Sequence, residues 1–385
     1  MAPWFSASSV APTLAQLWHL DVTGTAGLTV SVQLGFVVGA LVSAMLTLAD
    51  LWSARRLAAA AAFLAGLTTL GVAASSSALM GIGFRFLTGA ALAGVYPPGM
   101  KIAAGWFREA RGWAIGILVG ALTLGSATPH LVRWAAPPDA WREVLLVAAA
   151  LAWVGGALVL IVPSDGPYAA PSPRFSWTAA PGLLRDPAVR LANLGYLGHM
   201  WELYAMWTWI AVYVAASEVV RTSGATDGRA VAALVAFGVI GIGAVGCWLG
   251  GKYADRVGRT RVTSVAMLIS GACCLVVGAF FGRSLWLLGP FLLVWGIAVV
   301  ADSAQFSTAV SELSPAQYVG TALTLQTCLG FLLTTVTISL LPMLAAAIGW
   351  RWSMSVLAIG PAFGVWAMRS LRARPEALRL AGGRR

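Results

Sequence analysis

The chain has 385 residues, of which 59% are hydrophobic and only 10% are charged, and its mean hydropathy is +0.82. This composition excludes a water-soluble globular protein of this length and predicts a polytopic membrane protein. The net charge of +11 would suit a nucleic-acid-binding protein only if it formed a basic face on a soluble domain. Here the basic residues lie in polar segments between apolar runs, so membrane topology accounts for them.

Apolar runs recur along the whole chain, each close to the roughly 20 residues that a helix needs to cross a bilayer core about 30 Å thick. They predict an all-α fold with twelve transmembrane helices, the first of them shortened at its start. No charged segment precedes the first run, which argues against a signal peptide. The expected helices cover residues 1–18, 25–48, 57–78, 80–103, 112–135, 142–162, 190–216, 229–250, 262–281, 285–310, 319–341 and 350–369.

The distribution of basic residues predicts the orientation of these helices. When successive loops are assigned to opposite sides, one side receives 18 of the 25 Lys and Arg residues and the other receives six. Basic loops stay in the cytoplasm. We therefore expect a multi-pass protein of a bacterial inner (plasma) membrane with both termini in the cytoplasm.

The longest polar interruption runs from Pro163 to Pro187 and contains six prolines, which should prevent regular helix. It divides the chain into an N-terminal six-helix half (1–162), a cytoplasmic linker (163–189), a C-terminal six-helix half (190–370) and a basic cytoplasmic tail (371–385). The segment from Asp50 to Arg56, after the second helix, matches the segment from Asp255 to Arg261, after the eighth. Weak internal repeats of this kind are expected of two parallel halves.

The motif between the eighth and ninth helices is Gly250-Gly-Lys-Tyr-Ala-Asp-Arg-Val-Gly-Arg-Thr-Arg261, and we expect it to form a short gating loop. Its order G-x-x-x-D-R-x-G-R resembles the signature loop of the major facilitator superfamily (MFS). The resemblance implies the MFS fold, with two pseudo-symmetric six-helix bundles, and most closely suggests bacterial permeases of nitrate, cyanate and organic anions. The gating candidates are Gly251, Asp255, Arg256, Gly258 and Arg259, with Asp50, Arg55 and Arg56 in a degenerate first-half copy.

The fourth predicted helix contains a charged residue, Arg85, in the sequence Arg-Phe-Leu-Thr-Gly. This resembles the family pattern R-x-x-Q-G, which implies a role in proton coupling or in organising the first half. The alternative is an arginine that donates hydrogen bonds to carbonyl groups of neighbouring helices. Further along, Tyr96-Pro-Pro-Gly99 should break the helix, because proline removes a backbone donor.

The seventh predicted helix carries the strongest candidate site. His199, Glu202 and Met206 share one helical face, and Glu202 lies near the middle of its span. Burial disfavours a charged carboxylate, so Glu202 should be protonated or paired, and the imidazole could exchange its proton. This pattern predicts a proton-coupling site. The alternative is that His199 and Glu202 bond each other and only hold helices together.

Other candidates are less specific. In helix ten Asp302 and Gln305 share a face and could bind a polar solute, pair with His199 across a cavity, or form a packing network. His130, after Pro129, is either a ligand or part of a wall. Trp4, Trp201 and Tyr204 could stack on a substrate or face lipid.

The sequence contains no phosphate-binding loop, metal-ligand cluster or nucleophile elbow, so we expect neither an enzyme nor a bound cofactor. Within the resemblance, we expect a secondary active transporter that moves a small polar or anionic organic solute by alternating access, coupled to H+, as a monomer in the lipid bilayer. An exporter of drugs or metabolites with the same fold is the alternative. A non-transporting membrane sensor is a further one.

Overall fold

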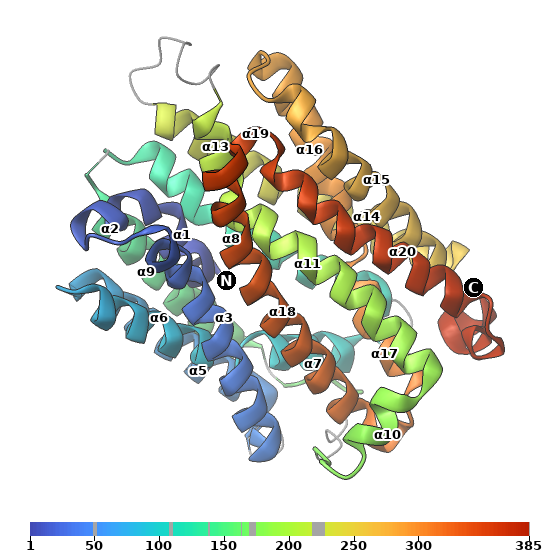
Figure 1. Ribbon diagram of the computed structural model, residues 1–385. Coiled ribbons are helices and arrows are strands. Elements are labelled where there is room, and N and C mark those ends of the chain that lie inside the picture. Colours follow the sequence, from blue (N-terminus) through green and yellow to red (C-terminus); the bar gives the residue numbers. More distant parts are fainter. Residues whose placement is uncertain are drawn as a thin grey trace.

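The structure is a computed structural model that describes residues 1–48, 52–107, 111–137, 139–162, 164–168, 175–217 and 228–384. Within these ranges all regular elements are helices (Figure 1). The first part of the chain forms α1 (Ala2–Ser9), α2 (Ala11–Leu17), α3 (Val22–Met45), α5 (Ala54–Ala74), α6 (Ala78–Leu92), α7 (Tyr96–Trp106), α8 (Arg111–Ala135) and α9 (Trp141–Ile161). The second part forms α10 (Ala180–Arg185), α11 (Pro187–Ala216), α13 (Gly228–Gly241), α14 (Gly243–Val257), α15 (Arg259–Phe280), α16 (Leu285–Ala301), α17 (Ser303–Leu313), η1 (Ala316–Tyr318), α18 (Val319–Ile348), α19 (Trp350–Ser353), η2 (Met354–Ala358), α20 (Ile359–Arg372) and η3 (Pro375–Gly383).

Ten helical segments of the described chain are long and apolar enough to cross a membrane. The other two predicted spans are α11, whose 30 residues extend about 45 Å, and the shorter pair α1 and α2, so the twelve-helix arrangement holds. Each observed helix or helix pair starts within three residues of its predicted start. The predicted break before Pro97 is confirmed, because α6 ends at Leu92 and α7 begins at Tyr96.

The prediction of a gating loop after the eighth span is wrong, because most of this segment is helical. Helix α14 continues to Val257 and α15 begins at Arg259, so the connection is a single residue, Gly258, with φ of +98°. Gly251, Asp255 and Arg256 therefore lie on a helix. Glycine makes the abrupt reversal possible, because other residues rarely adopt this backbone conformation.

The proline-rich linker is also more helical than expected. Its prolines were predicted to prevent helix between residues 163 and 187, but Ala180–Arg185 forms α10 and Pro187 begins α11. Proline is compatible with the first turn of a helix, where its missing N–H has no partner to lose. The division of the chain at residues 163 and 190 stays a prediction.

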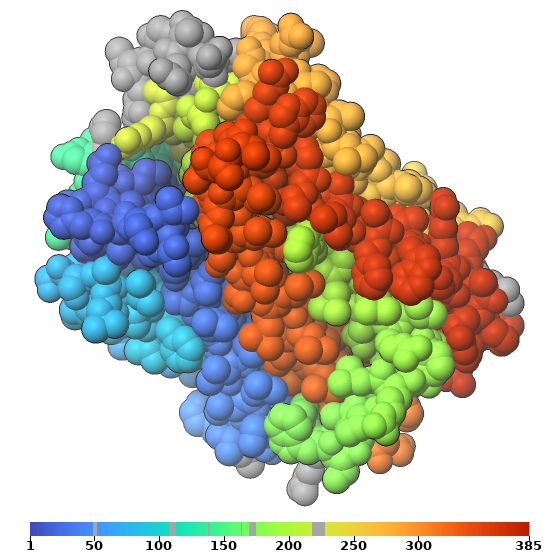
Figure 2. Space-filling view, viewed as in Figure 1, coloured from blue at the N-terminus to red at the C-terminus, as the bar shows by residue number. Residues whose placement is uncertain are grey.

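Two bundles make up the molecule. In the first, α3 packs on α6 and α5 on α9; in the second, α11 and α15 pack on α20 and α14 packs on α16. The bundles meet where α8 contacts α13 and α14 and where α18 contacts α3. Figure 2 shows α18 lying between α3 on one side and α11 on the other.

Glycines bring helices of each bundle into backbone contact. A Cβ atom on Gly35 or Gly39 of α3 would overlap a carbonyl oxygen of α6, and one on Gly246 or Gly250 of α14 would overlap a carbonyl oxygen of α16. Both pairs have the G-x-x-x-G spacing that allows close helix packing in membranes. The two halves thus use the same packing arrangement.

Candidate functional site

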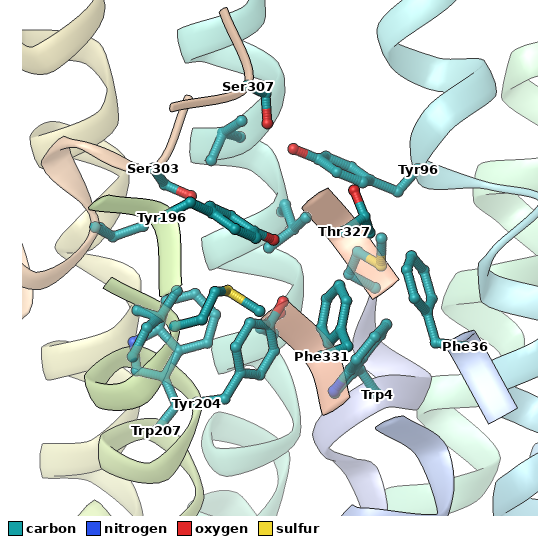
Figure 3. Close-up of a pocket in the computed structure, with 17 residues that line it drawn as sticks. Trp4, Phe36, Tyr96, Tyr196, Tyr204, Trp207, Ser303, Ser307, Thr327 and Phe331 are labelled. Atoms are coloured by element: carbon teal, nitrogen blue, oxygen red, sulfur yellow. The ribbon is translucent and has the colours of Figure 1, made fainter. Parts of the chain in front are cut away.

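A cavity of about 40 Å³ lies between the two bundles. Figure 3 shows hydroxyl groups gathered along it, with the phenol oxygens of Tyr96, Tyr196 and Tyr204 turned toward its centre. The two bundles contribute to the same wall, since Tyr96 belongs to α7 and the other two tyrosines to α11. The hydroxyl-bearing residues of the lining are Tyr96, Ser126, Tyr196, Tyr204, Ser303, Ser307 and Thr327.

One end of the cavity is filled by aromatic rings that we call the aromatic plug: Trp4, Phe36, Tyr204 and Phe331. The ring centroids of Phe36 and Phe331 are 4.6 Å apart, and those of Trp4 and Tyr204 are 5.7 Å apart. Trp4 and Phe36 belong to the first bundle and the other two to the second. The plug therefore joins the bundles through side chains alone.

We define the linker face as the end of the molecule that carries residues 164–168, the Gly258 turn and η3. Helix α11 begins at Pro187, next to the linker, and Tyr204 follows Tyr196 along it. The plug therefore lies on the side of the cavity away from the linker face. The hydroxyl groups of Tyr196 and Ser307 lie on the nearer side (Figure 3).

Two predicted site residues, Trp4 and Tyr204, line the cavity. None of the lining side chains in the described part of the chain is charged. The stripe that α11 turns to the cavity is Tyr196, Met200, Leu203, Tyr204 and Trp207. It neighbours the face of His199 and Glu202, so the sequence pointed to a helix that lines the cavity but to the face beside the lining.

His199 and Asp302 form a buried pair directly behind the cavity wall. The His199 Nδ1 atom is 2.9 Å from the Asp302 Oδ1 atom, and both side chains are at most 2% exposed. Asp302 sits at the break between α16 and α17, one residue before Ser303 of the lining. Of the alternatives left open for Asp302, the structure shows the contact with His199, but both partners lie within the second bundle and the contact does not cross the cavity.

Glu202 is held away from the cavity by three donors. Its carboxyl oxygens accept hydrogen bonds from Trp295 Nε1 at 2.6 Å, Ser270 Oγ at 2.9 Å and Cys274 Sγ at 3.2 Å. The side chain is 2% exposed. Glu202 and His199 therefore bond different partners, and Glu202 connects α11 with α15 and α16. No sequence pattern indicated Ser270, Cys274 or Trp295 as partners.

Arg85 has the arrangement expected of the structural alternative. It donates from Nε to the Leu28 carbonyl oxygen at 2.9 Å, from Nη1 to that of Pro3 at 2.6 Å, and from Nη2 to that of Trp4. The side chain is completely buried. Arg85 therefore anchors the first turn of α1 and with it the backbone that carries the Trp4 ring.

Gln305 belongs to a polar network at the linker face. Arg259 donates to its Oε1 atom at 2.8 Å and forms two hydrogen bonds, of 2.7 and 2.8 Å, with the carboxylate of Glu312. Asp255 Oδ1 lies 3.4 Å from Arg259 Nη1. This network ties the start of α15 to α17. Arg256 of the same motif is exposed.

The first-half copy of the motif is organised differently. Asp50 lies outside the described residues. The carboxylate of Asp165 accepts from the backbone N–H groups of Ala54 and Arg55 at 2.8 and 3.0 Å, and Arg55 Nη1 donates to the Val162 carbonyl oxygen at 2.9 Å. The start of α5 is therefore capped by the linker. Arg56 is exposed.

Three predicted site residues lie elsewhere. Trp201 donates from Nε1 to the Val356 carbonyl oxygen at 3.3 Å and so packs on η2. His130 is buried in α8 outside the cavity lining, and neither ring nitrogen has a partner among the described residues. Gly251 packs beside Gly116 of α8, at the contact between the bundles.

We expect Trp295→Phe to destabilise the protein more than Trp207→Phe. Both tryptophans are fully buried, but Trp295 donates to Glu202 whereas Trp207 Nε1 has no partner among the described residues. The same ring atoms are lost in both variants, but Trp295→Phe takes a donor from Glu202 whereas Trp207→Phe removes a donor that has no partner in the described chain. Both effects act in the same direction, so the two unfolding free energies should differ by about 1.5–3 kcal/mol. Thermal unfolding in detergent measures it, and equal losses would show that the bond contributes nothing.

Comparison with known proteins agrees with this architecture. The family model described as "Major Facilitator Superfamily" matches residues 1–337. No curated protein is detectably similar in sequence. Among solved structures, a bacterial homologue of the human lysosomal transporter Spinster, in an inward-facing and unoccupied conformation, superimposes with a TM-score of 0.73 at 15% identity, covering 96% of this chain and 94% of that one. At this identity the likeness concerns the fold. The family match, which spans most of the sequence, shows that the chain belongs to the Major Facilitator Superfamily.

Proposed function

We propose that this membrane transporter moves a small organic solute by alternating access and binds it in the central cavity. The supporting observation is that each bundle contributes side chains both to the cavity and to the aromatic plug. A rocking movement of one bundle against the other would separate Trp4 and Phe36 from Tyr204 and Phe331 and open the cavity toward the face that the plug closes. The cavity forms within one chain, so we propose that the monomer is the working unit.

The plug is strong enough to hold one state and weak enough to open. Its cross-bundle ring pairs each contribute about 0.5–1.5 kcal/mol beyond the area they bury. Three such pairs, Trp4 with Tyr204, Trp4 with Phe331 and Phe36 with Phe331, amount to a few kcal/mol. An energy difference of this size between two states can be overcome by a ligand that binds the other state more tightly.

Removing Phe331 should open the plug. Thr327→Cys, in a background where the four native cysteines are serine, places a reporter thiol in the cavity lining. A small membrane-impermeant thiosulfonate added to one side of the membrane at a time should label it much faster from the linker face than from the opposite face. After Phe331→Ala the two rates should become comparable, which we call two-sided labelling. Phe363→Ala, an exposed residue of α20, is the control. Labelling that stays one-sided in Phe331→Ala would contradict the proposed gate.

Proton coupling is the second part of the proposal, and we infer that the His199 and Asp302 pair carries it. The pair is buried within hydrogen-bonding distance, immediately behind Tyr196 and Ser303 of the cavity wall. In addition to Asp302, the ring of His199 faces Tyr196 and Phe306, at centroid distances of 6.2 and 5.5 Å. Protonation would change the attraction across the α16 and α17 break, and Ser303 would move with it. Glu202, already satisfied by three donors, is assigned a packing role.

Asp302→Asn should uncouple proton movement from solute movement. In proteoliposomes with an imposed pH gradient, an internal pH dye is followed while neutral, anionic and cationic small organic solutes are added in turn. The wild type should show solute-dependent proton flux, and Asp302→Asn should lose it while solute exchange across the membrane continues. Glu143→Gln, an exposed residue, should behave as wild type. Undiminished proton flux in Asp302→Asn would place the coupling site elsewhere.

The proposed orientation rests on charge. The loop assignment from the sequence gives 18 basic residues to the side of the linker and six to the opposite side. We propose on this ground that the linker face is cytoplasmic, in the inner membrane of a bacterium, because basic segments are retained on that side.

A further inference from the structure

We propose that the cavity selects a compact uncharged solute that combines an apolar ring or chain with a neutral oxygen group, such as an amide, carbonyl or hydroxyl. This inference rests on the proposed function, since it names the solute class of the same cavity. It keeps the polar alternative of the expectation from the sequence and drops the anionic one. Three features of the lining support it: its hydroxyl groups, its aromatic end and its lack of charged side chains.

The hydroxyl groups are the first feature. The phenol groups of Tyr96, Tyr196 and Tyr204 end near the centre of the cavity (Figure 3), and none of them forms a hydrogen bond with another described residue. A hydroxyl group both donates and accepts, so it pairs well with an amide or alcohol, which does the same. The indole Nε1 of Trp4, a donor only, is buried without a partner among the described residues. An oxygen acceptor on the solute would satisfy it.

The aromatic plug is the second feature. Trp4, Phe36 and Phe331 present ring surface to the cavity on the side away from the linker face. An apolar ring or chain would stack there while its oxygen group meets the tyrosines. In the structure the cavity has room for on the order of three water molecules. A solute of benzene size would require it to widen, as alternating access allows.

The absence of charged side chains is the third feature. Two buried charged side chains of the bundles are already engaged, Arg85 with three carbonyl oxygens and Asp302 with His199. Among the described lining residues, the one basic group is the backbone amino group of Met1, and the benzoate probe below tests it. A buried charged solute needs an opposite charge or several strong hydrogen bonds to offset its lost hydration. No lining side chain of the described residues offers that charge. A neutral solute avoids this cost.

The test uses three probes with the same ring and different charge: benzamide, benzoate and benzylammonium. Binding to the purified protein is measured by calorimetry in detergent. Benzamide should bind at least about tenfold more tightly than either ion. Tyr196→Phe and Tyr204→Phe should each weaken benzamide about tenfold, whereas Tyr253→Phe, exposed on α14, should not.

Tighter binding of benzoate or benzylammonium, or no measurable binding of benzamide, would overturn the solute class. The result is separable from the proposed function. Benzamide binding without two-sided labelling in Phe331→Ala would support the solute class and count against alternating access. Two-sided labelling without benzamide binding would support alternating access and overturn the solute class.

A second inference concerns the C-terminal tail and is supported by a separate set of contacts. The structure assigns η3 the role of a strap that holds the linker face of the second bundle. Ala377 and Leu380 of this segment are completely buried, so the tail is packed on the protein. The backbone N–H of Ala381 donates to Glu312 Oε2 at 3.1 Å. The same oxygen accepts from Arg259 Nε at 2.8 Å.

Two further contacts extend the strap across the bundle. Arg379 Nη1 donates to the Leu313 carbonyl oxygen at the end of α17, at 3.5 Å, and Arg384 Nη1 donates to the Asp255 carbonyl oxygen near the end of α14. Helices α14 and α17 both pack on α8 of the first bundle. The tail therefore links the two helices that must move relative to α8 when the linker face opens, and its contacts should slow that opening.

The strap is tested by opening kinetics. Ser307→Cys, in the cysteine-free background, reports access to the cavity from the linker face. Ala381→Pro removes the donor to Glu312 and also displaces the end of the strap, because proline cannot adopt the φ of +47° at this position. Truncation after Ala373 removes the whole strap. Both should increase the labelling rate by about fivefold or more, since a hydrogen bond to a charged acceptor is lost.

Ala381→Gly is the matched control. It keeps the N–H and suits the φ of +47° at this position, so its labelling rate should equal or fall below that of the wild type. Size-exclusion profiles establish whether each variant is folded. If the truncated chain is not folded, Ala381→Pro alone provides the test. Unchanged labelling in Ala381→Pro would overturn the strap.

Discussion

A charged side chain inside a bilayer must find its partners within the protein, and this constraint fixes much of the structure. Arg85 finds carbonyl oxygens of α1 and α3, Glu202 finds donors on α15 and α16, and Asp302 finds His199. Water is absent from the hydrocarbon region, so each of these groups would otherwise carry a large desolvation cost. Each charge therefore fixes the position of a neighbouring helix.

Because the charges are used in this way, the cavity between the bundles is lined by neutral side chains. Hydroxyl groups and aromatic rings remain to contact a solute, and they come from both halves of the chain. The ionisable pair His199 and Asp302 lies directly behind the cavity wall, since each residue is next in sequence to a lining residue, Met200 or Ser303. From this position, a change in the protonation of the pair could move lining residues such as Ser303 without placing a charge in the cavity.

The contacts between the bundles differ at the two ends of the cavity. Away from the linker face, the aromatic plug joins them through apolar rings. At the linker face, glycines of α8 approach the backbone of α14, and the Arg259 network with the tail holds α14, α15 and α17 together. Apolar contacts separate without leaving unpaired polar groups, whereas a hydrogen-bonded network must exchange partners or be hydrated. The two ends should therefore open at different energetic cost.

The sequence by itself determined the class of fold and the places where helices begin, because bilayer thickness sets the length of an apolar run and proline and glycine mark its breaks. It also singled out α11, from the spacing of His199 and Glu202, and this helix lines the cavity. Only the tertiary structure decided which face of α11 meets the cavity. Tyr196 and Tyr204 repeat at helical spacing as clearly as His199 and Glu202 do, and no local pattern shows which stripe will face another helix. The partners of Glu202, Arg85 and Arg259 come from segments distant in sequence, and the packing of whole helices brings them together.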